Sequence, residues 1–150
     1  MNELQDLYQE LILDHNRSPR NYRRIENADG EANGYNPLCG DRVTVYVSID
    51  NDVVSDVAFE GSGCAISTAA ASLMTQSIKG KSIAEAEALF ENFRRLVTGE
   101  AVASDNGPAL GKLEALGGVR RFPARVKCAT LVWHTLKAAL DRQSQMVTTE

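Results

Sequence analysis

Residues 42–49, Arg-Val-Thr-Val-Tyr-Val-Ser-Ile, decide the fold because every second side chain along them is a branched aliphatic one. This period of two is typical of a half-buried β-strand. Residues 50–52, Asp-Asn-Asp, supply a turn, and residues 53–60 form a second strand, so the pair is predicted to be an antiparallel hairpin. Part of residues 25–35 is expected to add a third strand. One face of the first strand carries Val43, Val45, Val47 and Ile49.

Helical patterns lie on both sides of this hairpin. Residues 3–14 carry apolar side chains at helical spacing. The alanine-rich residues 64–79 suit a helix that packs closely against a sheet. Ser82 and Glu85 form a capping box, which opens another helix that is expected to stop at Gly99.

The C-terminal part of the chain adds the remaining elements. Residues 99–120 are rich in glycine, and three leucines among them indicate one or two helical turns. Pro123 suits the first position of a last helix that runs to about Arg142, and the tail from residue 144 to 150 is predicted to be frayed. The order of elements predicts a single α+β domain over residues 1–150, with helices packed on one face of a small antiparallel three-stranded sheet.

Composition narrows the class of protein. A chain of 150 residues that is 43% hydrophobic is long enough for one domain with a real core. No stretch approaches the roughly 18 apolar residues of a membrane span, and the first ten residues lack the pattern of a signal peptide. We therefore expect a cytoplasmic protein with no membrane partner. The oligomeric state is open, with a monomer as the default expectation. The net charge of −4 also argues against a nucleic-acid partner.

Three cysteines, Cys39, Cys64 and Cys128, are the candidates for chemistry. An odd number of cysteines in a reducing compartment argues against a disulfide framework. They lie 25 (from 39 to 64) and 64 (from 64 to 128) residues apart, without a Cys-x-x-Cys pair. Spacing alone therefore gives a weak metal signal, and a buried, inert thiol is the default interpretation of each.

The first cysteine lies in an irregular loop just before the strand. Pro37 and Gly40 bracket this loop, and Cys39 is two residues from Asp41. In an extended chain, residues i and i+2 point to the same side, so a thiolate and a carboxylate are expected to converge. The alternative is a turn aspartate beside an idle cysteine.

The other two cysteines lie at predicted helix starts. Cys64 follows Gly61-Ser62-Gly63, where the unpaired N–H groups of a helix terminus favour a thiolate. Cys128 lies in the first two turns of the last helix and shares a face with Arg125, with Lys127 adjacent in the chain. Positive charge there favours a thiolate as well. The alternatives are a small core residue at Cys64 and ordinary solvated cations near Cys128.

Together these residues form a candidate metal-binding set. Three thiolates and the carboxylate of Asp41 make four ligands for a tetrahedral Zn²⁺. A carboxylate ligand that is held more weakly than the thiolates suits a metal site that exchanges ligands. His15 and His134 are expected to be cap or packing residues rather than ligands. The basic loop of residues 17–24, with Arg17, Arg20, Arg23 and Arg24, is expected to be solvated surface, with docking of a partner as the alternative. A second basic group is formed by Arg120, Arg121, Arg125 and Lys127.

Four segments of the chain resemble the IscU/SufU/NifU-N family of iron–sulfur cluster assembly proteins. The resemblance runs from residue 1 to about residue 140 and implies the compact α+β domain of that family. The four segments occur in the family's order, which makes the match specific. They are Asp14–Asn21, Asn36–Asp41, Gly61–Ser67 and Arg125–Leu131.

Three departures from the IscU scaffolds point to the SufU branch of the family. Lys127 stands where those scaffolds usually carry histidine before the third cysteine. Residues 121–125, Arg-Phe-Pro-Ala-Arg, replace the Leu-Pro-Pro-Val-Lys motif that a dedicated chaperone recognises. The stretch between Cys64 and Cys128 is also longer than in the scaffolds, and the extra length is expected within residues 99–120.

The resemblance to SufU implies a zinc-dependent sulfurtransferase. In that branch zinc is bound through residues that match Cys39, Asp41, Cys64 and Cys128. A SufS-type cysteine desulfurase docks, its histidine takes over one coordination position, and the thiolate matching Cys39 accepts the persulfide sulfur. The sulfur then passes to a reductant or to downstream iron–sulfur scaffold proteins. Arg125 matches a family position near the site, where it is expected to help position or activate the thiolates.

Two alternatives remain at this stage. The same residues would hold iron if the chain were a scaffold on which a [2Fe–2S] cluster is assembled. The chain would instead be a non-catalytic, zinc-stabilised interaction module if the metal only supported the fold.

Overall fold

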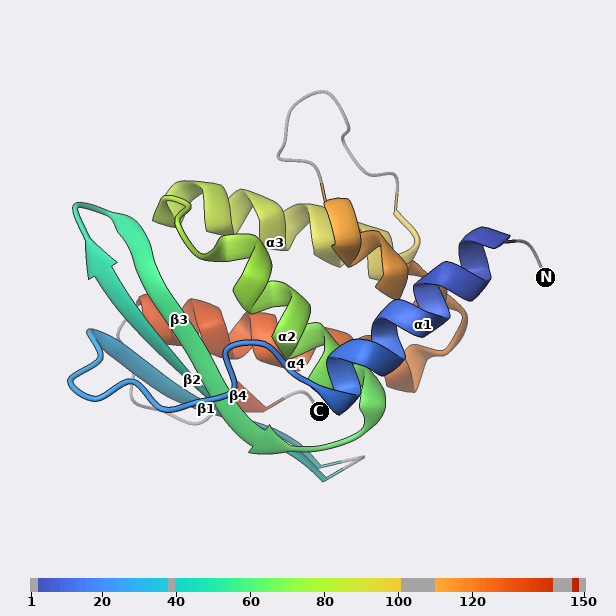
Figure 1. The fold of residues 1–150 in the computed structure, drawn as a ribbon, viewed down its shortest axis with the longest axis horizontal. Helices are drawn as coiled ribbons and strands as arrows, with labels where there is room; N and C mark the ends of the chain where they lie inside the picture. Colours follow the sequence, from blue (N-terminus) through green and yellow to red (C-terminus); the bar gives the residue numbers. More distant parts are fainter. Residues whose placement is uncertain (1–2, 38–39, 101–109, 142–146, 149–150) are drawn as a thin grey trace.

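We analysed a computed structural model of the chain, which describes residues 3–37, 40–100, 110–141 and 147–148. Helices cover one side of a small, twisted sheet, as Figure 1 shows, so the predicted α+β architecture is confirmed. The elements are α1 (Glu3–Arg17), β1 (Gly30–Asn36), β2 (Asp41–Asp50), β3 (Val53–Ser62), α2 (Ala65–Ile78), α3 (Ile83–Thr98), the 3₁₀ helix η1 (Gly111–Arg121), α4 (Pro123–Leu140) and β4 (Val147–Thr148).

The sheet has the strand order β3-β2-β1-β4. The predicted hairpin is β2–β3, and its two-residue turn, Asn51-Asp52, has positive φ at both positions, which asparagine and aspartate tolerate best among non-glycine residues. The third strand is also confirmed, at Gly30–Asn36, and it pairs antiparallel with β2. Three antiparallel strands therefore form the body of the sheet.

The tail contributes a short fourth strand that the sequence did not predict. Val147 and Thr148 pair in parallel with Gly34 and Tyr35 of β1. At these two residues the structure differs from the predicted frayed tail, because the open edge of β1 offers backbone groups for pairing. Residues 142–146 and 149–150 lie outside the described part of the chain.

The core lies between the inner face of the sheet and helices α2 and α4. The alternating valines of β2 are almost fully buried there, together with Trp133 and Leu131 of α4. α4 approaches β1 closely because Gly34 has no side chain: a Cβ there would collide with Thr135 Oγ1. The short approach places the start of α4 directly beside the start of β2.

The helix ends follow the local signals in the sequence. Ser82 and Glu85 form the predicted capping box through two hydrogen bonds of 3.1 Å, and Gly99 ends α3 in the left-handed conformation with φ of 83°. Helix α1 continues three residues beyond its predicted end, to Arg17. The predicted one or two turns near Leu113 are a longer 3₁₀ helix, η1, which spans 11 residues.

The two histidines have packing roles, as the sequence predicts. His15 is buried at the end of α1, where its Nδ1 lies 2.6 Å from Ser72 Oγ on α2. Burial lowers the pKa of His15 below its ordinary value. The ring of His134 meets Phe90 edge-on, with centroids 5.0 Å apart. Neighbouring Trp133 stacks against both Phe90 and Phe93.

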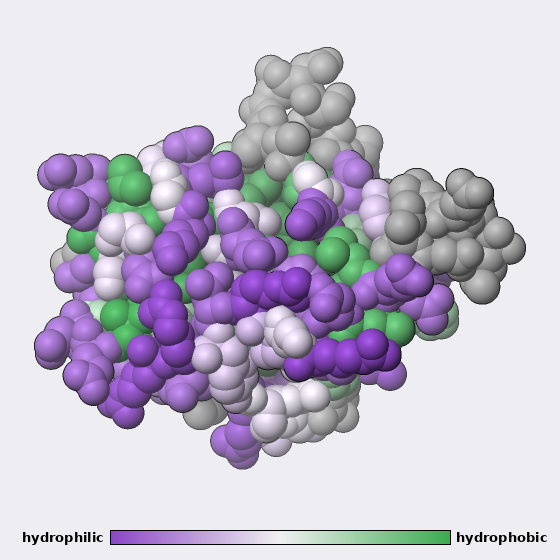
Figure 2. Space-filling view, in the orientation of Figure 1, coloured by the Kyte–Doolittle hydropathy of each residue, from purple (hydrophilic) through white to green (hydrophobic). Residues whose placement is uncertain are grey.

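The outer surface is largely polar. In the view of Figure 2, hydrophilic residues cover most of the face that includes α1, α2 and β3, and hydrophobic residues lie in separate small groups between them. Among the described helices, none is both long enough and apolar enough to cross a membrane.

Candidate metal centre

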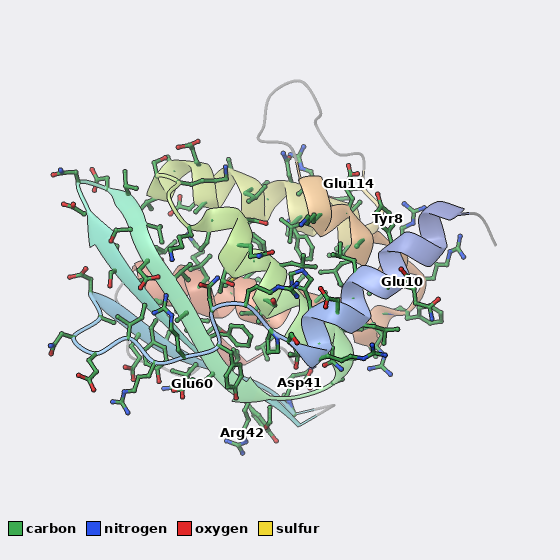
Figure 3. The ribbon with its side chains drawn as sticks, viewed as in Figure 1. Tyr8, Glu10, Asp41, Arg42, Glu60 and Glu114 are labelled. Carbon is green, nitrogen blue, oxygen red and sulfur yellow. The ribbon has the colours of Figure 1, made fainter. Side chains whose placement is uncertain are left out.

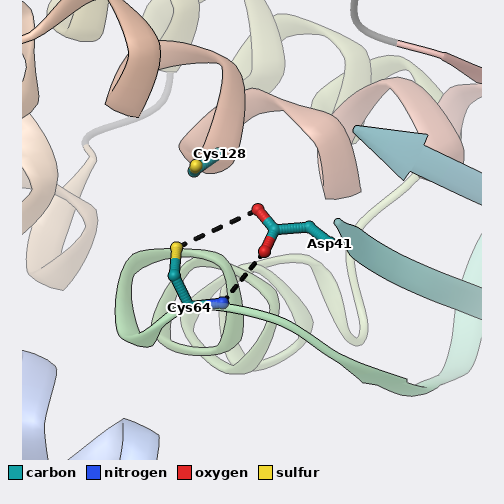
Figure 4. A group of neighbouring side chains, drawn as sticks. All are labelled: Asp41, Cys64 and Cys128. Atoms are coloured by element: carbon teal, nitrogen blue, oxygen red, sulfur yellow. Dashed lines mark hydrogen bonds between the residues drawn. The ribbon is translucent and has the colours of Figure 1, made fainter. Parts of the chain in front are cut away.

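Three predicted site residues meet at the end of the molecule where β2, α2 and α4 begin. Asp41 is the first residue of β2, Cys64 caps α2, and Cys128 lies in the second turn of α4. One ligand atom from each lies within 4.8 Å of the others. Figure 4 shows the three side chains pointing toward one another from these separate elements.

Asp41 lies on the buried side of the sheet because it continues the period-two pattern of Val43 and Val45. Its side chain is 0% exposed. One carboxylate oxygen, Oδ1, accepts a hydrogen bond of 2.9 Å from the backbone N–H of Cys64. The other oxygen, Oδ2, lies 3.9 Å from the Cys64 thiol, which donates to it. The carboxylate is therefore held at the start of α2.

Gly63 makes this approach possible. A Cβ at residue 63 would lie 2.5 Å from Asp41 Oδ1 and 3.0 Å from Asp41 Cγ, both tighter than ordinary van der Waals contact. The glycine before Cys64 therefore leaves room for the carboxylate.

Cys64 occupies the N-cap position of α2, in agreement with the prediction that it begins a helix. Its extended backbone, with φ of −72° and ψ of 170°, turns the sulfur toward the first turn of the helix. There Sγ accepts a hydrogen bond of 3.4 Å from the backbone N–H of Ser67. Such N–H groups stabilise negative charge on the sulfur. The half-buried side chain remains accessible from solvent.

Cys128 is the most enclosed of the three, with 0% exposure. Its thiol donates to the carbonyl oxygen of Ala124 at 3.6 Å, one turn earlier in α4. The side-chain amide of Asn36 donates to the same sulfur at 3.8 Å. Asn36 is buried and pairs with Asp41 across β1 and β2, so it lines the site as well. Asn36 begins one of the four segments that resemble the family, but no local pattern of residues indicates its contact with Cys128.

Arg125 faces the two sulfurs from the first turn of α4. Its guanidinium lies beside the sulfurs of Cys64 and Cys128, and negative charge on these sulfurs raises the pKa of Arg125 above its ordinary value. The predicted shared face of Arg125 and Cys128 is therefore observed. The side chain is exposed, so the cation closes the solvent side of the cluster. Lys127 makes no ion pair within the described residues.

Cys39 lies outside the described residues, so its convergence with Asp41 remains a prediction. The extended chain that was expected to carry both side chains on one side is wrong at Gly40, which has a left-handed φ of 73°. Gly40 instead closes a turn, in which its N–H donates to the carbonyl oxygen of Asn36 at 2.8 Å.

The donors suit a zinc ion. Tetrahedral zinc with bonds of about 2.0–2.3 Å to oxygen and sulfur keeps its ligand atoms roughly 3.3–3.8 Å apart, so ligand atoms that lie within 4.8 Å of one another need to move together by at most about 1.0–1.5 Å. The carboxylate of Asp41 is buried, and among the described residues no cationic side chain pairs with it. Because an uncompensated buried charge is costly, a bound cation fits this position.

The compact α+β domain carries two thiols and a buried carboxylate at one end, which are the donors of a candidate metal centre. The sequence matches the family described as the NifU-like N-terminal domain over residues 7–129, and the chain belongs to this family. This finding confirms the resemblance identified from the four sequence motifs.

Curated relatives cover nearly the whole chain. It is 43% identical over 140 residues to the zinc-dependent sulfurtransferase SufU of Bacillus subtilis, with 93% of each chain covered. It is 38% identical over 144 residues to the iron–sulfur cluster assembly scaffold protein IscU of Streptococcus pyogenes, covering 96% of this chain and 89% of the relative. Relatives of both kinds therefore share most of their length with it.

A solved structure supports the fold. The crystal structure described as an iron–sulfur cluster assembly scaffold protein for the SUF system, from Fervidobacterium islandicum, superposes with a TM-score of 0.83. It is 38% identical, and the match covers 91% of this chain and 98% of that one. The architecture is thus shared with a SufU protein.

Proposed function

We propose that this chain accepts persulfide sulfur from a cysteine desulfurase and transfers it onward for iron–sulfur cluster assembly. The site would be a zinc centre held by Asp41, Cys64, Cys128 and Cys39. The observation that carries the proposal is the cluster of a fully buried carboxylate and two thiols within 4.8 Å. The similarity to a SufU protein named as a zinc-dependent sulfurtransferase supports it.

The donor set agrees with a zinc ion in a reactive rather than purely structural centre. Structural zinc sites use cysteine and histidine, whereas one ligand here is a carboxylate. Bound zinc would keep the thiolates deprotonated without redox activity of its own. Asp41 is oriented for this role by the backbone N–H of Cys64, and Asn36 orients the sulfur of Cys128 in the same way.

Cys39 is the proposed sulfur acceptor. Cys128 is enclosed and Cys64 is half-buried as a helix cap, so neither is well placed to attack a sulfur presented by another protein. The thiolate of Cys39 would attack the outer sulfur of the desulfurase persulfide. A new S–S bond then forms on Cys39, the S–S bond of the desulfurase breaks, and its cysteine leaves as a thiolate, without net oxidation or reduction.

Arg125 would support this step by its charge. Its exposed guanidinium lies beside the sulfurs of Cys64 and Cys128, where it stabilises their thiolates. A cation at the solvent side would also attract an incoming persulfide anion.

The test uses Cys39→Ala, Asp41→Ala and the wild-type chain, each purified without added metal. We expect one equivalent of zinc in the wild type and less in Asp41→Ala. Stimulation of a SufS-type desulfurase, and transfer of ³⁵S from labelled cysteine, should be lost in Cys39→Ala. Undiminished stimulation by Cys39→Ala would exclude the acceptor role of this residue.

A scaffold for a [2Fe–2S] cluster is the second candidate, because relatives with similar coverage are named scaffold proteins. The same carboxylate and thiols would then hold iron. Anaerobic incubation with iron and a sulfide source should assemble a cluster in that case, and Asp41→Ala should slow its release. Purified protein with iron and matching acid-labile sulfide, and without zinc, would favour the scaffold over the sulfurtransferase.

A further inference from the structure

The two basic groups of the sequence differ in how far they are neutralised. In the first group, Arg20 pairs with Asp14 and Arg23 pairs with Asp56, each at 2.6 Å. Their charge is compensated within the molecule. This group is therefore a weak candidate for attracting a partner.

The cations around the metal centre are not paired with carboxylates. Arg42, Arg121 and Arg125 are exposed and make no ion pair with an acidic side chain within the described residues, although Arg125 also lies beside the sulfurs of Cys64 and Cys128. Arg42 follows Asp41 directly, so its side chain lies on the opposite, open face of the sheet, where it stacks over the ring of Tyr35 at 4.6 Å. Figure 3 shows Arg42 projecting from the end of β2, away from the helices.

An exposed aromatic side chain lies among these cations. Phe122 is 60% exposed and separates η1 from α4, directly beside Arg121 in the chain. Exposed aromatics and arginines are enriched in protein–protein interfaces. The combination therefore indicates a surface built for contact with another protein, and not only for solvation.

Acidic side chains lie at the far end of β2. Asp50 and Asp52 are exposed at the hairpin turn, about 30 Å from Asp41 by the strand rise of about 3.3 Å per residue. The molecule has a net charge of −4, yet three exposed arginines, Arg42, Arg121 and Arg125, lie at the end that carries the metal centre. A local group of cations of this kind steers and orients an incoming partner.

We propose that Arg42, Arg121, Phe122 and Arg125 form a docking rim that receives an acidic protein surface around the donated sulfur. This inference rests on the proposed function, because the partner is the persulfide-bearing desulfurase. It adds the chemistry of that partner's surface: carboxylates that pair with the arginines, and an apolar recess for Phe122.

The experiment measures association of the chain with a SufS-type cysteine desulfurase by stopped flow, from about 20 to 300 mM NaCl, together with transfer of ³⁵S from labelled cysteine. The variants are Arg42→Glu and Arg121→Glu. The matched control is Lys81→Glu, which makes the same change of charge in the turn after α2. Cys64 caps the other end of that 14-residue helix, about 20 Å away by a rise of about 1.5 Å per residue.

We expect each rim variant to associate at least about tenfold more slowly than wild type at low salt, with a smaller difference at high salt where screening is strong. Lys81→Glu should stay within about twofold of wild type, and zinc content should be unchanged in every variant. Equal slowing by Lys81→Glu, or no slowing by the rim variants, would refute the proposal that the rim docks the desulfurase.

The association rate and the ³⁵S transfer test two different proposals: docking at the rim, and sulfur transfer as the function. Salt-dependent association that the rim variants weaken, without any ³⁵S transfer, would support the rim and refute sulfur transfer. Efficient ³⁵S transfer with association that is independent of salt and of the rim would refute the rim alone. Absence of any association would refute both.

Discussion

The packing of Gly63 against Asp41 gives a direct test of the metal centre through a single methyl group. Gly63→Ala would place a Cβ 2.5 Å from Asp41 Oδ1. Bringing that contact to 3.0 Å, still a tight one, requires a shift of about 0.5 Å. Metal sites tolerate deviations of only about 0.2 Å in ligand distance. The backbone at residue 63 does not adopt a positive φ, so the substitution acts through space and not through strain.

Overpacking by one extra methyl group typically costs about 1–3 kcal/mol of free energy. If the carboxylate moves to relieve the contact, this cost falls on metal binding. At about 1.4 kcal/mol per tenfold, zinc affinity should then drop roughly 5- to 150-fold. The unfolding free energy of the metal-free protein should change less, because the three atoms nearest to that Cβ all belong to Asp41 and none belongs to the hydrophobic core.

The assay is competition for zinc with a chromophoric chelator, with urea unfolding of the metal-free protein measured alongside. Gly118→Ala is the matched control, because a Cβ there meets nothing within 4 Å. Zinc affinity in Gly63→Ala equal to that of Gly118→Ala would refute the reasoning that Asp41 is a ligand held in this position.

Three further predictions concern the fold, each measured by urea unfolding with the fluorescence of Trp133, the only tryptophan of the chain. Ser82→Ala should lower the unfolding free energy by about 1 kcal/mol, because it removes the capping box of α3, and an unchanged midpoint would contradict this role. Gly34→Ala should cost about 1–3 kcal/mol or more, because its Cβ would collide with α4; a cost no larger than that of Gly118→Ala would argue against the close approach. Burial and nearby Arg20 lower the pKa of His15 below 6.5, so the unfolded chain binds a proton at this imidazole at a higher pH than the folded chain does. The unfolding free energy should therefore be full above about pH 6.5 and should fall as the pH drops below it. His15→Asn should reduce this dependence of the unfolding free energy on pH.

The local sequence predicts the elements because their signals act over a few residues. The alternation of Val43, Val45 and Val47 indicates a strand with one buried face, and that face also buries Asp41 at its start. The capping box of Ser82 and Glu85 joins residues three apart. Such patterns need no knowledge of distant segments, so strand, hairpin and helix starts could be predicted closely.

Elements that depend on distant partners were predicted less well. Strand β4 exists through pairing with β1, more than 100 residues earlier in the chain, and no pattern in Val147-Thr148 indicates it. The length of η1 depends on packing against neighbouring helices, since a long 3₁₀ helix is intrinsically unfavourable. Tertiary contacts override local preference in both places.

The sequence by itself determined the candidate ligands, because cysteine and aspartate at element boundaries suit metal or sulfur chemistry and recur in a known family pattern. Only the tertiary structure decided their geometry: Asp41, Cys64 and Cys128 converge because the starts of β2, α2 and α4 pack at one end of the core. It also revealed Asn36 against Cys128, a contact between residues 92 positions apart. Contacts across such separations arise from packing of whole elements, which no local pattern of residues encodes.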